Sequence, residues 1–110
     1  MKEDLLEILF NDLLFSVVCT PIKVVTKKYG EENSWTFGKC RSSQVYGNNQ
    51  IYTEECCQKA GSYPISCKDS AKDGWHGGYL EIDGMKYCKD FKDGLVKTEE
   101  ATMSMNKNLS

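Results

Sequence analysis

The stretch that decides the fold is CKDSAKDGWHGGYLEIDGMKYC, residues 67–88. Its second half contains two strand-like segments, residues 79–82 and 85–88, and only Asp83 and Gly84 separate them. An Asp-Gly pair in a two-residue link favours a type I′ turn, because both residues of that turn must adopt positive φ. The sequence therefore predicts a β-hairpin at this point.

The turn also sets the register of the hairpin, and side chains along a strand alternate between its two faces. One face is expected to form an apolar surface, made of Leu80, Ile82, Met85 and Tyr87. On the other face Glu81 is expected to lie opposite Lys86. Such a cross-strand pair of opposite charges contributes a few tenths to ~1 kcal/mol.

The first half of the stretch, residues 69–78, is rich in Asp and Gly and reads as a loop. Glycines belong in it where the backbone needs positive φ or comes close to another segment. Trp75 is predicted to anchor the loop onto the core, because large aromatic rings dominate burial in small domains. The alternative is that Trp75 contacts a ligand together with His76 and Tyr79.

Calcium is the sharper hypothesis for this loop. Asp69 and Asp73 stand at positions one and five of an EF-hand-like start, but position twelve is Leu80 instead of a bidentate glutamate. An EF-hand is therefore excluded. A site for Ca²⁺ that uses Asp69, Asp73 and a nearby carbonyl remains as a hypothesis, and the alternative is a turn anchored by Trp75.

Six cysteines indicate a disulfide framework and an oxidising compartment. They are Cys19, Cys40, Cys56, Cys57, Cys67 and Cys88, and their spacing lacks the paired Cys-x-x-Cys of a zinc site. A bond between Cys67 and Cys88 would join the start of the loop to the end of the hairpin. The other expectations are Cys40 with Cys56 or Cys57, and Cys19 with whichever of those two remains.

Length and charge narrow the class of protein. The 110 residues fit one domain, and the net charge of −2 with scattered lysines and Arg41 as the only arginine argues against a nucleic-acid binder. His76 is the only histidine, and no motif ties a nucleophile to it. The sequence therefore predicts a protein that is not an enzyme.

The N-terminal segment, residues 1–19, is apolar but interrupted by Glu3, Asp4, Glu7 and Asp12. A transmembrane helix needs ~20 apolar residues, so no stable membrane span is expected. Two interpretations stay open: an amphipathic helix, or a poor signal peptide cleaved near Cys19. Cleavage there would leave an odd number of cysteines.

The rest of the chain divides into three parts by composition. Residues 20–33 are expected to be a linker or an edge strand, because Pro21 blocks a helix and lysines guard the edge. Residues 34–92 are expected to form the disulfide-rich β domain, in which Trp35 and Phe37 share one face of a short strand. Residues 93–110 lose their apolar period and are expected to be a polar tail.

The residues from Asp69 to Ile82 resemble a loop found in extracellular β modules, in which Asp-Gly-Trp-Asn/His-Gly is followed by a strand. Such modules occur in invertebrate secreted proteins and microbial surface proteins. The resemblance covers residues 63–91, and it departs at Lys72, where those loops usually carry Gly, and at His76, where Asn is commoner. It implies a secreted or cell-surface β domain with a binding or structural role.

Together these features predict a mostly β protein: a small, disulfide-stabilised, antiparallel, sandwich-like domain with an N-terminal apolar helical segment. The expected function is a secreted, extracellular or cell-surface binding and adhesion module without catalysis, whose partner is an extracellular protein or carbohydrate. One alternative is a toxin-like or defence protein, because the cysteine order C–C–CC–C–C is that of cystine knots, although the spacing here is longer. The other is a Ca²⁺-dependent recognition domain.

Overall fold

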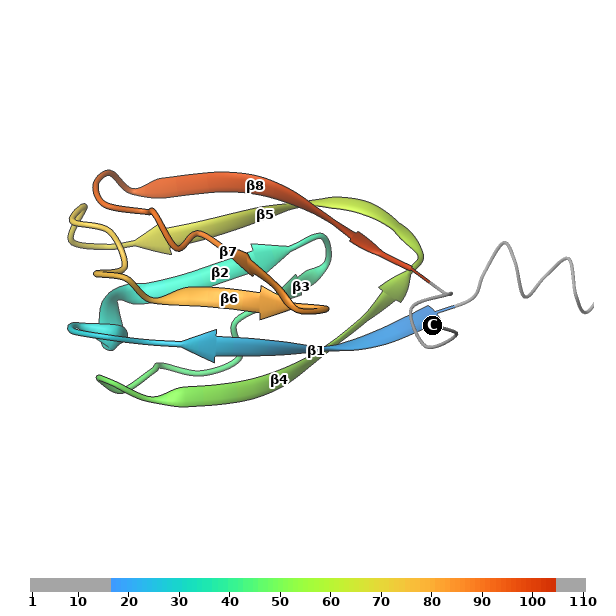
Figure 1. Ribbon diagram of the computed structural model, residues 1–110, viewed down its shortest axis with the longest axis horizontal. Helices are drawn as coiled ribbons and strands as arrows, with labels where there is room; N and C mark the ends of the chain where they lie inside the picture. The colour runs from blue at the N-terminus through green and yellow to red at the C-terminus, as the bar shows by residue number, and fades with distance from the viewer. Residues whose placement is uncertain (1–16, 105–110) are drawn as a thin grey trace, which may run out of the picture.

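The computed structural model describes residues 17–104, which form two four-stranded antiparallel sheets packed face to face (Figure 1). One sheet has the strand order β4-β1-β6-β7, and the other has the order β3-β2-β5-β8. The strands are β1 (Val17–Val25), β2 (Asn33–Phe37), β3 (Cys40–Arg41), β4 (Ile51–Lys59), β5 (Gly61–Asp69), β6 (Tyr79–Ile82), β7 (Met85–Tyr87) and β8 (Val96–Met103), and the 3-10 helix η1 (Gly30–Glu32) precedes β2. The predicted fold class, a disulfide-stabilised antiparallel β domain, is confirmed.

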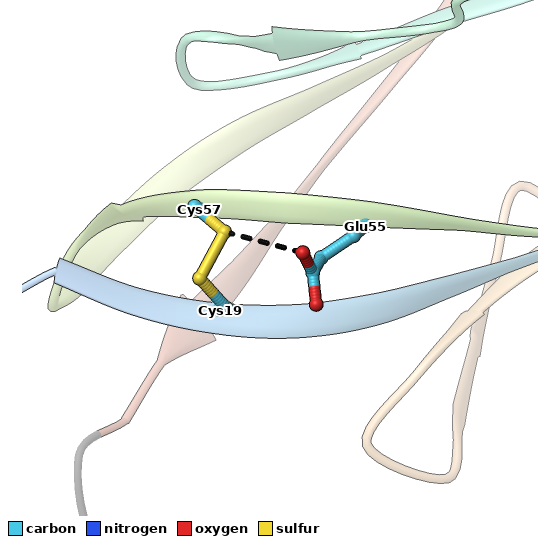
Figure 2. Close-up of side chains that lie close together, drawn as sticks. All are labelled: Cys19, Glu55 and Cys57. Atoms are coloured by element: carbon cyan, nitrogen blue, oxygen red, sulfur yellow. Dashed lines mark hydrogen bonds between the residues drawn. A yellow bond between two sulfur atoms is a disulfide. The ribbon is translucent and has the colours of Figure 1, made fainter.

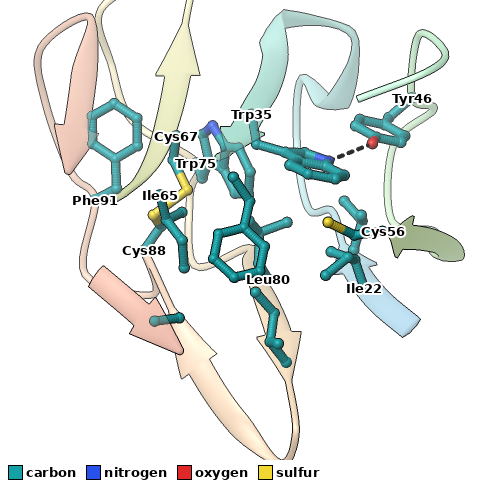
Figure 3. Close-up of a cluster of buried hydrophobic side chains, with 14 of the residues drawn as sticks. Ile22, Trp35, Tyr46, Cys56, Ile65, Cys67, Trp75, Leu80, Cys88 and Phe91 are labelled. Carbon is teal, nitrogen blue, oxygen red and sulfur yellow. Dashed lines mark hydrogen bonds between the residues drawn. A yellow bond between two sulfur atoms is a disulfide. The ribbon is translucent and has the colours of Figure 1, made fainter. Parts of the chain in front are cut away.

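Alternation of apolar side chains explains why these segments become strands that bury one face. In β2, Trp35 and Phe37 are buried and Ser34 and Thr36 lie on the other face, as the sequence predicts. The core between the sheets also takes side chains from the other long strands: Ile22, Val24, Cys56, Ile65, Cys67, Leu80, Ile82, Ala101 and Met103. Figure 3 shows this cluster from both sheets.

A polar chain supports one end of the core. The Trp35 indole N–H donates to the Tyr46 hydroxyl over 2.7 Å, and that hydroxyl donates to the Glu54 carboxylate (Figure 3 shows the first of these bonds). Burial and then the hydrogen bond to Glu54 raise the pKa of Tyr46 well above its usual value. The phenol therefore stays protonated and serves as both donor and acceptor inside the protein.

The predicted hairpin is β6–β7, with the predicted register of Leu80 opposite Tyr87 and Glu81 opposite Lys86. Asp83 and Gly84 have φ of 51° and 79°, as a type I′ turn requires. Of the predicted apolar surface, Leu80 and Ile82 are buried, whereas Met85 is 61% exposed, so the core covers only part of that surface. The reason is the place of Met85 beside the turn on β7, which is the edge strand of its sheet.

Two expected boundaries differ from the structure. In the expected linker or edge strand of residues 20–33, residues 20–25 belong to β1, which lies between β4 and β6 and pairs with both, so this part is a central strand. Residues 93–110 are not simply a tail, because β8 pairs with β5 over eight residue pairs and buries Ala101 and Met103. The polar residues of β8 occupy the positions that face away from the core, so the composition of this segment resembles that of a polar tail.

The start of β1 bears on the expectation for residues 1–19. Residues 1–16 lie outside the described part of the chain, whereas Val17, Val18 and Cys19 open β1 and do not continue a helix. Cleavage near Cys19 would remove these three residues from the sheet, together with one half of a disulfide. Within residues 17–104, no helix has the length and hydrophobicity needed to cross a bilayer.

Three disulfides complete the fold. Cys67 bonds to Cys88, the expected pair, and Cys40 bonds to Cys56, one of the two alternatives left open. Cys40–Cys56 connects β3 to β4 in the other sheet, and Cys67–Cys88 connects β5 to the residue that follows β7 in the other sheet, whereas Cys19–Cys57 joins the neighbouring strands β1 and β4. Along the chain, the segment closed by Cys40–Cys56 lies within that closed by Cys19–Cys57, and the segment closed by Cys67–Cys88 is separate. The bonds therefore do not cross, as they would in the cystine knot that the cysteine order suggested.

Candidate functional site

The acidic corner of the protein consists of Glu32, Asp69 and Asp73. Antiparallel pairing of β2 with β5 sets Asn33 opposite Asp69, which brings Glu32 beside the loop that follows β5. The backbone N–H of Ser70 also donates to the Glu32 carbonyl over 3.2 Å. Carboxylate oxygens of the three acids lie within 4.8 Å of one another. The fold thus gathers like charges from two distant parts of the chain.

Asp69 is the buried member of the corner, with 1% of its surface exposed. Its Oδ1 accepts the N–H of Ala71 over 3.2 Å, and its Oδ2 accepts the N–H of Asp73 over 2.6 Å. These bonds fold the start of the loop back on the end of β5, which is the turn-forming role that Asp commonly has. Asp69 therefore has a structural role whether or not the corner binds an ion.

Asp73 is the exposed member, and its Oδ2 lies 3.4 Å from Nε2 of His76. The pKa of Asp73 is lowered from its ordinary value, first by its side-chain hydrogen bond with Asp69 and then by the nearby His76. The His76 ring also lies 5.3 Å from the Tyr29 ring, centre to centre. Tyr29 and His76 thus border the acidic corner on the solvent side.

Glu32 has the opposite electrostatic situation. Desolvation, followed by repulsion from Asp73 and Asp69, raises the pKa of Glu32 above its ordinary value of 4.5. Its Oε1 is buried without a hydrogen-bond donor, and both polar atoms of Asn33, a residue only 4% exposed, also have no partner. Buried polar atoms normally find partners, and a cation at the corner would supply one to Oε1 of Glu32.

The oxygen-only donor set fits a hard divalent cation. Ca²⁺ takes 6–8 oxygen ligands from carboxylates, carbonyls, amides and water. Three carboxylates supply such oxygens, and the orphaned Oε1 of Glu32 is a ligand atom without another use. The expected pair Asp69 and Asp73 therefore lies together, and Glu32 joins it.

The three residues expected to contact a ligand do not form one surface. Trp75 is fully buried, and its indole N–H donates to the Lys68 carbonyl over 2.9 Å, so it anchors the loop, and its alternative role as a ligand contact is wrong. His76 lies at the acidic corner. Tyr79 lies on the outer face of its sheet, with the ammonium of Lys86 4.7 Å from its ring centre.

Glycines and left-handed residues shape the loop around Trp75. Gly74 has φ of 79°, and a Cβ there would stand 2.3 Å from the Phe91 carbonyl oxygen. Lys72 and His76 also have positive φ, 65° and 56°. These are the two positions at which the chain departs from the loop it resembles, and Gly and Asn are the residues that tolerate this conformation best.

A groove adjoins the acidic corner on the outer face of β2, β5 and the start of β8. It encloses about 270 Å³, and its lining combines acids and apolar side chains: Glu32, Ser34, Lys68, Asp69, Ser70, Leu95 and Val96. Leu95 and Val96 are 52% and 49% exposed. The sequence does not single out Glu32, Leu95 or Val96, because only strand pairing brings them to Asp69.

In three comparisons, no protein-family model, no curated protein and no solved structure matches the chain. The geometry of the acidic corner and the groove is therefore the basis for assigning a function.

Proposed function

We propose that the protein is a secreted or cell-surface binding and adhesion module that acts without catalysis. Three disulfides in a small domain are typical of extracellular proteins, because oxidising compartments preserve such bonds. The two bonds between the sheets hold the core together, and a rigid scaffold lowers the entropy cost of binding. These features support an extracellular module with a preformed contact surface.

The groove beside the acidic corner carries this proposal. Leu95 and Val96 provide exposed apolar area, and Glu32, Ser34 and Lys68 provide polar groups at the same place. Binding sites commonly combine an apolar surface with a few convergent polar groups that fix orientation. The partner we expect is an extracellular protein or carbohydrate that presents apolar area next to hydroxyl or amino groups.

Absence of catalysis is part of the proposal and rests on the chemical state of the cysteines and of the only histidine. All six cysteines are in disulfides, so none is a thiol nucleophile. The only histidine, His76, is engaged with Asp73 and with the ring of Tyr29. A binding role uses the groove as the fold presents it and needs no further group.

The test is a screen of the full chain against a glycan array and a panel of extracellular-matrix proteins, followed by two matched variants. Leu95→Arg changes the groove, and Val45→Arg changes an apolar residue elsewhere that is 77% exposed. We expect Leu95→Arg to weaken binding at least tenfold and Val45→Arg to leave it unchanged. Equal binding by both variants would place the contact surface elsewhere.

A second candidate function, Ca²⁺-dependent recognition, is favoured by the acidic corner. An ion held by Glu32, Asp69 and Asp73 would neutralise the like charges there and give the orphaned Oε1 of Glu32 a partner. Such an ion would also lie beside the groove, because Glu32 and Asp69 belong to both. Recognition at the groove would then depend on calcium.

Two measurements on protein stripped with a chelator test this candidate: titration calorimetry with Ca²⁺, and urea unfolding with and without Ca²⁺. Calcium at a hundred times its Kd should raise the free energy of unfolding by about 2.7 kcal/mol. Asp73→Asn should weaken calcium binding, and Asp93→Asn, a change of another exposed aspartate that lines a different groove, should not. If calcium gives neither heat nor a stability increase, binding at the groove is independent of calcium.

A further inference from the structure

The disulfide between Cys19 and Cys57 differs from the other two in its exposure. Both of its cysteines are exposed, whereas Cys67 and Cys88 are fully buried and Cys56, in the remaining bond, is fully buried as well. Figure 2 shows Cys19–Cys57 across the outer face of β1 and β4, with the Glu55 side chain next to it. A dissolved thiol can therefore reach this bond without the protein opening.

The position of this bond also makes it separable from the fold. Cys19 and Cys57 are direct cross-strand partners in a ladder of nine residue pairs between β1 and β4. Opening the bond leaves that ladder, the core and both bonds between the sheets in place. The two sulfurs also remain opposite each other, so that the bond can close again.

We propose that Cys19–Cys57 is a thiol-exchange site, at which the folded protein forms a reversible mixed disulfide with an external thiol. The thiolate of the incoming molecule attacks one sulfur of the pair and forms a new S–S bond. The Cys19–Cys57 bond breaks, and the other cysteine leaves as a thiolate that takes up a proton. The incoming thiol is oxidised to the disulfide level and one cysteine is reduced, so no further oxidant or reductant is needed.

Glu55 gives the site a charge preference. Its Oε1 lies 3.7 Å from Sγ of Cys57, and because that sulfur has no proton, the contact is electrostatic rather than a hydrogen bond. A carboxylate at this distance repels an anionic thiol and attracts a cationic one. The class of molecule that the site accepts is therefore a thiol with an amino group close to its sulfur.

The experiment exposes the oxidised full chain to graded concentrations of cysteamine, a cationic thiol, or of mercaptopropionate, an anionic one. Free thiols are trapped with iodoacetamide, and the modified cysteines are located by peptide mass mapping. We expect the mixed disulfide and its partner thiol only on Cys19 and Cys57 at the lowest effective concentration. Tryptophan fluorescence, which reports Trp35 and Trp75 in the core, should remain unchanged.

Glu55→Gln tests the charge preference separately from simple exposure. Two unit charges ~4 Å apart in water change a rate by up to about fivefold, and Glu55 raises the rate of cysteamine while it lowers the rate of mercaptopropionate. The variant should therefore reduce the cysteamine-to-mercaptopropionate rate ratio by up to about 25-fold. Glu100→Gln, which removes another exposed carboxylate on β8, is the matched control and should leave the ratio unchanged. An unchanged ratio in Glu55→Gln would contradict the role of Glu55.

Two results would overturn the proposal as a whole. In the first, Cys40–Cys56 or Cys67–Cys88 reacts at the same or a lower thiol concentration than Cys19–Cys57. In the second, opening of Cys19–Cys57 is accompanied by loss of the native tryptophan signal, because exchange would then require unfolding. Neither result depends on the groove or on calcium, so the proposal stands or falls independently of the proposed function.

Discussion

Glu32 and Asp73 lie in one acidic corner, yet the pKa of the first is raised and the pKa of the second is lowered. The difference follows from their neighbours. Asp73 shares a hydrogen bond with Asp69 and contacts His76, whereas Glu32 faces both aspartates with a buried oxygen that has no donor. Glu32 therefore destabilises the ion-free protein, and the same carboxylate would stabilise the protein with a bound cation.

Glu32→Gln tests this opposition. In a chelator at neutral pH, the variant should unfold at a higher temperature than the unmodified protein, because it removes a repelled carboxylate. In excess calcium the order should reverse, because the variant lacks a ligand. Thermal unfolding followed by circular dichroism measures both, and the same order under both conditions would argue against a cation at this corner.

The pH dependence of that difference has a definite sign. Because the pKa of Glu32 is raised in the folded state, the fold binds its proton more tightly than the unfolded chain does. The destabilising effect of Glu32 is therefore absent below its ordinary pKa of 4.5 and grows as pH rises through the folded-state value. In chelator, Glu32→Gln should lose its advantage on acidification.

Lys72 is a second residue whose effect can be predicted. Its φ of 65° costs an L-residue roughly 1–2 kcal/mol, and Gly removes that cost while losing about 0.5–1 kcal/mol of chain entropy. Lys72→Gly should therefore stabilise the protein by about 0.5–1 kcal/mol in urea unfolding. Lys39→Gly is the control, since Lys39 lacks positive φ, and it should destabilise the protein.

At the scale of elements, two turns with the same backbone angle differ in their surroundings. Gly74, in the loop, and Gly84, in the hairpin, both have φ of 79°. A Cβ at Gly84 would meet nothing within 4 Å, whereas one at Gly74 would stand 2.3 Å from the Phe91 carbonyl oxygen. The hairpin turn is thus defined by local conformation alone, and the loop is defined by its packing on residues 91–92.

The matched variants Gly84→Ala and Gly74→Ala separate these two causes. Gly84→Ala should cost about 1 kcal/mol, the penalty for an L-residue in this conformation. Gly74→Ala should cost about 1–3 kcal/mol more, because the backbone of residues 91–92 must also move. Equal losses in urea unfolding would show that the loop can shift freely away from Phe91.

At the scale of the whole molecule, the disulfides divide by position into one bond within a sheet and two between sheets. The cysteines of Cys19–Cys57 are 38 residues apart and those of Cys67–Cys88 are 21 apart. By loss of chain entropy in the unfolded state, the first bond should therefore stabilise the fold by about 0.5 kcal/mol more than the second. Packing has the opposite effect: removal of the buried pair Cys67–Cys88 also leaves space in the core, which lowers the free energy of unfolding further. The second effect is larger.

Replacing Cys67 and Cys88 by Ala should therefore lower the free energy of unfolding by about 3–5 kcal/mol, against about 2–4 kcal/mol for Cys19 and Cys57 replaced by Ser. Urea unfolding of the two double variants measures the difference. A larger loss in the Cys19 and Cys57 variant would mean that loop entropy outweighs packing in this domain.

Several features were predictable because they depend on residues close in the sequence. Alternation and the Asp83-Gly84 turn predicted the β6–β7 hairpin and its register, and the size of Trp75 predicted its role as an anchor. The number and spacing of the cysteines predicted a disulfide framework, and the join between loop and hairpin suggested Cys67–Cys88. Each of these follows from local geometry or from composition.

Other features depend on which strands pair, and only the tertiary structure decided them. β1 is central in its sheet, β8 is a strand, and Met85 is exposed at an edge, because neighbouring strands rather than local sequence determine burial. Glu32 meets Asp69 for the same reason: the β2–β5 register pairs Asn33 with Asp69, 36 positions apart, and so brings Glu32 beside Asp69. Sequence alone therefore determined the class and the local turns, and long-range pairing of strands decided the groove and the acidic corner.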